Sequence, residues 1–132
     1  MDIEIVALVA TALLAIAVGF QVGLAVGAPW GAAAYGGRAT AGVGVLPVAY
    51  RWASGVAAMT LLGAVWVVLA SASLVGRGPV SGSVLTTMLW CLSGLFVLNT
   101  LGNARGRHRA ERWGAGGVTA LLAVLCAVMA AS

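Results

Sequence analysis

Residues Ile3 to Gly27, IEIVALVATALLAIAVGFQVGLAVG, give the clearest indication of the fold class of this chain. Its only charged residue is Glu4, and it exceeds the roughly 20 mainly apolar residues that a helix needs to cross a bilayer. The whole chain of 132 residues has the same character, since 62% of it is hydrophobic and 8% is charged. Soluble domains are about 45–50% apolar and about 25% charged. The composition therefore excludes a soluble enzyme, a nucleic-acid-binding domain and a disordered regulator, and it predicts an integral membrane protein.

Three further stretches are long and apolar enough to span a bilayer. Together with the first, they predict a single all-α domain, a four-helix transmembrane bundle. The predicted spans are residues 3–27, 52–75, 80–102 and 115–132. The connecting segment 28–51 is long and carries little charge. We expect it to lie along the membrane interface or to fold partly back into the bundle.

The arginines predict the orientation of this bundle. The net charge of +4 depends on arginine alone, because the chain has no lysine, and six of its seven arginines lie in the first and third loops. The positive-inside rule then places both loops in the cytoplasm and both termini outside. The dominance of Ala, Gly, Val, Leu and Arg, which have GC-rich codons, indicates a high-GC bacterial source. The predicted location is a bacterial plasma membrane.

Small residues recur every fourth position along one face of the first span. They are Ala15, Gly19, Gly23 and Gly27. Small side chains at this spacing let two helix backbones approach closely, which is a main source of helix association in lipid. Two interpretations stay open: ordinary packing inside one bundle, which the sequence favours, and a seam between copies of the chain in a homo-oligomer.

Four polar side chains are predicted to lie at similar depth, near the cytoplasmic side of the membrane. They are Gln21, Arg51, Asn99 and Asn103. An amide exposed to hydrocarbon is costly, so Gln21 and Asn99 are expected to face protein or water. The cluster is interpreted either as hydrogen bonding between helices, worth about 0.6 kcal/mol per contact, or as a pocket for a solute or a lipid headgroup. We favour the first, because no ionisable residue other than cysteine lies well inside a predicted span.

The third loop concentrates positive charge. Its arginines are Arg105, Arg107, Arg109 and Arg112. They are expected to set the topology and to attract anionic lipid headgroups, at about 1 kcal/mol for each arginine near the surface. His108 lies among them and is expected to be solvated, since a lone histidine makes no metal site. Glu111 is expected to pair with a neighbouring arginine and to contribute little.

The sequence contains no recognisable catalytic, cofactor-binding or metal-binding motif. It has no paired carboxylates, no nucleophile beside a base and no His/Cys cluster. Cys91 and Cys126 form no CxxC motif, and their proximity stays open. The predicted function is a non-catalytic accessory, scaffold or lipid-interacting membrane protein without a cofactor. Its partners would be the bilayer and either copies of itself or another membrane protein. The alternative is a small homo-oligomeric transporter or channel for a polar solute or ion, whereas a membrane enzyme acting on a lipid or quinone has less support.

Two short segments carry a resemblance to known proteins. They are GAPWG at residues 27–31 and LNTLGN at residues 98–103, with further similarity at GFQ (19–21) and ERW (111–113). On these segments the chain resembles a group of small, uncharacterised actinobacterial integral membrane proteins. The resemblance covers most of the chain and implies a four-span membrane protein, with no activity or catalytic residue attached. It draws attention to the Pro-Trp-Gly loop and to the Asn-rich end of the third span, which are expected to meet at the inner interface.

Overall fold

Four long helices make up the computed structural model, which describes residues 1–40 and 44–132. The helices are α1 (Ile3–Val26), α2 (Val48–Ser71), α3 (Gly82–Ala104) and α4 (Gly116–Ala131). A π-helical turn, η3 (Ala110–Ala115), runs directly into α4, and two 3-10 turns, η1 (Gly31–Ala33) and η2 (Tyr35–Gly37), lie in the first loop. No strand occurs within the described ranges. The predicted all-α, four-helix fold is confirmed.

Every one of the four spans is long and apolar enough to cross a membrane. Only 22–33% of the apolar window in each span is buried inside the protein. Large apolar side chains therefore point outward, and Leu98 and Val124 are 67% and 58% exposed. A monomer in water does not keep so much continuous apolar surface exposed, whereas a bilayer covers it. The structure is that of a small multi-pass membrane protein.

The ends of α1 follow from local sequence. The Asp2 carboxylate accepts a hydrogen bond from the Glu4 backbone N–H at 3.0 Å, which satisfies one of the free donors of the first turn. At the other end, Gly27 adopts a left-handed φ of 98°, which glycine tolerates best, and its N–H bonds back to the last turn. These two caps confine α1 to nearly the predicted range.

Two other helices begin earlier than predicted. α2 begins at Val48 rather than at residue 52, because Pro47 directly precedes it and has a φ that suits a helix start. The fourth span begins at Ala110 rather than at residue 115, since the π-helical turn joins α4 without a break. This earlier beginning brings Glu111 into the span.

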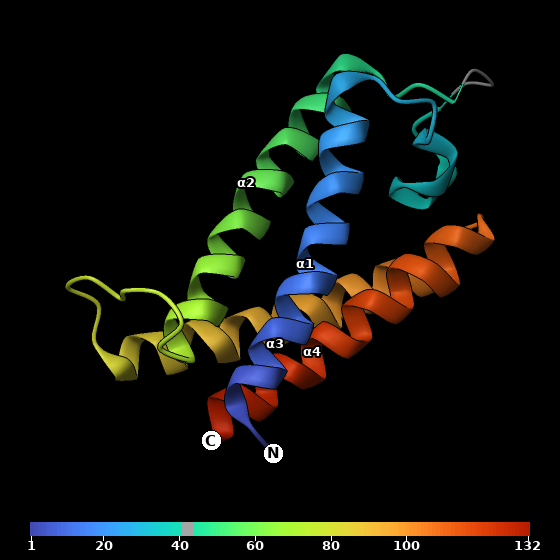
Figure 1. Cartoon of the computed structure of the whole chain (residues 1–132). Coiled ribbons are helices and arrows are strands. Elements are labelled where there is room, and N and C mark those ends of the chain that lie inside the picture. The colour runs from blue at the N-terminus through green and yellow to red at the C-terminus, as the bar shows by residue number, and fades with distance from the viewer. Residues whose placement is uncertain (41–43) are drawn as a thin grey trace.

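The helices form two hairpins, in which α1 packs along α2 and α3 packs along α4. Figure 1 shows the hairpins crossing near the chain termini and diverging toward the first loop. The main core lies where they meet, and its largest fully buried members are Phe96, Leu14, Leu89 and Leu122. Ala7 and Ala10 lie on the buried face of α1, where their small size permits close packing.

The first loop folds back between the diverging hairpins (Figure 1). Ala34 and Leu46 are buried there and pack with Leu24 of α1 in a second, smaller core. The Gly31 N–H donates to the Gly44 carbonyl at 2.6 Å and closes the loop on itself. The loop therefore contributes to the interior of the bundle.

Candidate functional site

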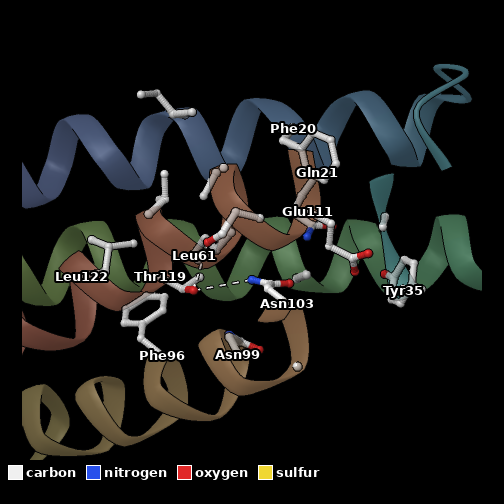
Figure 2. Close-up of a pocket in the computed structure, with 18 of the residues that line it drawn as sticks. Phe20, Gln21, Tyr35, Leu61, Phe96, Asn99, Asn103, Glu111, Thr119 and Leu122 are labelled. Atoms are coloured by element: carbon white, nitrogen blue, oxygen red, sulfur yellow. Dashed lines mark hydrogen bonds between the residues drawn. The ribbon is translucent and has the colours of Figure 1, made fainter. Parts of the chain in front are cut away.

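A cavity of about 750 Å³ lies between the two hairpins, at the end of the bundle that holds the first and third loops. Figure 2 shows polar side chains at one end of it and apolar ones at the other. The polar end holds Gln21, Tyr35, Asn103 and Glu111, from α1, η2, α3 and η3. The apolar floor consists of Leu61, Phe96 and Leu122. This volume lies in the range of small-molecule sites, which are mostly apolar with a few convergent polar groups.

Glu111 is the acidic residue of this cavity, and its side chain is only 4% exposed. Its Oε1 accepts a hydrogen bond from the Gly36 N–H at 2.8 Å, whereas its Oε2 has no partner. The expectation that Glu111 pairs with a neighbouring arginine is wrong. Arg112 instead donates to the Gly106 carbonyl, from Nε at 3.3 Å and from Nη2 at 3.0 Å. Glu111 lines the cavity because the π-helical turn that contains it forms the first turn of the fourth span.

Sequence reasoning missed Glu111 as a cavity residue, although one signal was present. Acidic residues are favourable in the first turn of a helix, where they meet the positive end of the helix dipole. That preference would have placed the start of the last span before Glu111 rather than after it. The four arginines of the same segment made it look like a solvated loop.

The turn η2 adopts an unusual backbone conformation. Tyr35 has a φ of +52°, which is rare for a bulky residue, and Gly36 and Gly37 follow with φ of +72° and +71°. This conformation places the Tyr35 hydroxyl 2.9 Å from the Oγ of the fully buried Ser54, and it directs the Gly36 N–H at Glu111. Backbone strain of this kind persists only where surrounding contacts hold it, often at functional sites.

Three of the four predicted polar residues line the cavity: Gln21, Asn99 and Asn103. Gln21 Oε1 is buried without a hydrogen-bond partner. Asn103 Nδ2 donates to the Thr119 hydroxyl at 3.4 Å, which links α3 to α4. Asn99 is exposed on α3 at the edge of the cavity. The cluster therefore contains both a link between helices and amide groups that are free to meet a ligand.

Arg51 does not join this cluster. Its Nε donates to the Ala25 carbonyl at 3.0 Å, and its guanidinium lies beside Gly27. The side chain thus caps the last turn of α1, where cationic groups meet the negative end of the helix dipole.

The small-residue face of α1 divides into two halves. Ala15 and Gly19 are exposed, and a Cβ at Gly19 would meet nothing within 4 Å. A Cβ at Gly23, in contrast, would overlap the Trp30 indole, which stacks on Phe20 with ring centroids 6.0 Å apart. Close packing inside this chain therefore uses only the half of the face nearest the first loop.

Alanine substitutions on this face should separate the two halves. Gly23→Ala is expected to displace Trp30 and lose the stack, worth about 0.5–1.5 kcal/mol. Gly19→Ala should stabilise the monomer by about 0.5–1 kcal/mol, because it removes a helical glycine without a clash. Unfolding in detergent measures the change in stability of each variant. The fluorescence emission of Trp30, with the other tryptophans replaced by phenylalanine, measures the displacement of its indole. An equal loss in both variants would contradict this division, and a changed oligomer size in Gly19→Ala would identify a seam between copies.

The remaining predicted residues lie outside the cavity. Arg105, Arg107, Arg109 and Arg112 are all exposed at the end of the bundle where the cavity is polar. Cys91 is exposed, Cys126 is buried, and both are free thiols. Within residues 1–40 and 44–132, no three His, Cys, Asp or Glu side chains gather as metal ligands.

Comparison of the chain with protein-family models, with curated proteins and with solved structures found no match. Function has therefore to be inferred from the cavity and its residues.

Proposed function

We propose that the protein is a non-catalytic, lipid-interacting membrane protein that holds an amphipathic molecule in the cavity between its two hairpins. The observation that carries this proposal is the polarity gradient of the cavity. An apolar chain would lie against Leu61, Phe96 and Leu122, and a polar headgroup would lie between Gln21 and Glu111. A site of this kind needs no cofactor and no catalytic group.

The side of the cavity between α2 and α3 supports access from the bilayer. These two helices pack on each other less extensively than either packs on the other helix of its own hairpin. Thr60, Leu95 and Leu98 line the cavity there, and all three are exposed on spans that are apolar enough to lie in lipid. A lipid-like molecule can therefore enter sideways. Asn99, exposed at the same edge, supplies the hydrogen-bonding group that a polar headgroup would meet.

We further propose that the cavity's polar end faces the cytoplasm of a bacterial cell, as the arginine distribution predicts. The four exposed arginines of the third loop would then border the cavity with positive charge and attract anionic headgroups. A homo-oligomeric transporter or channel fits the geometry less well. The apolar end of the cavity lies against Phe96 and Leu122, which are 1% and 0% exposed and belong to the main core.

Filling the cavity edge tests this function. Gly102 lines the cavity and has open space around it, so Gly102→Leu should obstruct the site without a clash. Gly94→Leu is the matched control, because Gly94 also has open space on α3 but does not line the cavity. Native mass spectrometry of gently extracted protein should show a bound lipid-like molecule in the wild type and in the control, and little in Gly102→Leu. The proposal would be refuted if both variants retained the lipid-like molecule equally. It would also be refuted if the wild type carried no bound molecule after incubation with lipids from its own membrane.

A further inference from the structure

The side-chain carboxylate of Glu111 is buried in the protein and has few hydrogen-bond partners. One oxygen accepts a single backbone hydrogen bond from Gly36, and the other accepts none. Burying an ionised carboxylate without a cation or several donors is strongly unfavourable. An ionised Glu111 therefore calls for a positive group in the cavity.

Two arginines and the histidine at this end of the bundle have partners other than Glu111. Arg112 donates to the Gly106 carbonyl, and Arg51 donates to the Ala25 carbonyl. His108 uses its Nδ1 to accept from the Ala110 N–H at 3.2 Å. In the part of the chain that the structure describes, no cationic side chain donates to the Glu111 carboxylate, so a bound molecule can supply the positive charge that would balance it.

The free polar atoms around Glu111 include hydrogen-bond acceptors. Gln21 Oε1 is buried and has no hydrogen-bond partner. The Nδ2 of Asn103 donates to Thr119, so its side-chain carbonyl oxygen is left to accept a hydrogen bond. Figure 2 shows Gln21, Asn103 and Glu111 gathered at the same end of the cavity, from three different elements. Acceptors beside a carboxylate are complementary to a positively charged donor. A primary ammonium group offers three N–H donors and one positive charge.

We propose that the polar end of the cavity binds the primary ammonium group of an amphipathic amine, with Glu111 as its counter-ion and Gln21 as a hydrogen-bond acceptor. This inference rests on the proposed function and names the chemistry of the headgroup. The apolar floor takes the hydrocarbon chain. A bare metal ion is a poorer fit, because it would leave the cavity of about 750 Å³ nearly empty, and hard divalent cations such as Ca²⁺ require about six to eight oxygen ligands.

Binding of radiolabelled octylamine to the full chain in phosphatidylcholine nanodiscs tests the proposal, with protein-free nanodiscs as background. Glu111→Gln should weaken binding at least tenfold, because it removes the charge but keeps an oxygen for the Gly36 N–H. Glu4→Gln is the control, since Glu4 is an exposed carboxylate outside the cavity. It should leave binding unchanged. Octanol, which has the same chain without charge, should bind equally to the wild type and to Glu111→Gln. Gln21→Leu should also weaken octylamine binding, by less than Glu111→Gln does.

Competition identifies the source of the ammonium group. Displacement of octylamine by lysophosphatidylethanolamine, but not by lysophosphatidylcholine, would support a lipid headgroup with N–H donors, and displacement by free amines alone would support a free amphipathic amine. Equal octylamine binding by Glu111→Gln and wild type would overturn the ammonium site, as would displacement by Na⁺ but not by K⁺. In either case octanol binding that Gly102→Leu abolishes would still uphold the amphipathic cavity. Failure of both octylamine and octanol to bind would refute the proposed function itself.

Discussion

Gly31→Ala should open the first loop and lower the free energy of unfolding by about 1–3 kcal/mol, the usual cost of overpacking. A Cβ at Gly31 would lie 2.7 Å from the Gly44 carbonyl oxygen and 2.5 Å from the Thr40 methyl carbon. The Gly44 oxygen belongs to the backbone and accepts the Gly31 N–H at 2.6 Å, so it cannot turn aside without breaking the loop closure. The loop would then release Leu46 from the smaller core.

Unfolding in detergent and amide hydrogen exchange at residue 31 measure this effect. Gly55→Ala is the matched control, because a Cβ at Gly55 would meet nothing within 4 Å. It should be neutral or stabilising by about 0.5–1 kcal/mol, since glycine is unfavourable inside a helix. Equal stability of the two variants would show that Gly44 does not pack on Gly31.

Gly106→Ala should detach the first loop from the fourth span. A Cβ at Gly106 would overlap the Glu111 carboxylate, which must then swing away from the Gly36 N–H. Gly106 has no left-handed φ, so alanine brings no backbone strain of its own. The lost hydrogen bond leaves the Gly36 N–H without its partner, and the expected destabilisation is about 1–3 kcal/mol.

Hydrogen exchange distinguishes this effect from that of Gly31→Ala. In Gly106→Ala the Gly36 amide should lose its protection, while the Gly31 amide, which bonds within the loop, should keep it. Gly117→Ala is the control, because it lies at the start of α4 with open space around it. Unchanged protection at Gly36 would mean that Glu111 does not hold the loop.

Much of this molecule could be predicted from its sequence. The number of spans follows from four long apolar runs, because a bilayer leaves a chain of this composition no other solvent. The grouping of Gln21, Asn99 and Asn103 at one end of the bundle also follows, since a helix rises by a fixed distance for each residue. All three line one cavity.

The residues at which the helices begin were harder to predict than the number of spans. Arg51 was expected in the polar cluster from its position near Trp52, but α2 begins at Val48 and Arg51 meets the end of α1 instead. A shift of a few residues turns a side chain around the helix axis by a large angle, because each turn takes 3.6 residues. Orientation in the membrane depends on charge counting alone and stays a prediction.

The class of this protein follows from its residues alone: it is an all-α bundle of four helices apolar enough to lie in lipid. The character of the cavity, in contrast, depends on how the helices and loops pack in three dimensions. Glu111 lies in it because a π-helical turn includes this residue in the last span, and because Gly36, 75 residues away in the chain, donates to its carboxylate. Local sequence patterns carry no information about contacts between such distant segments. The packing of the first loop between two diverging hairpins brings them together.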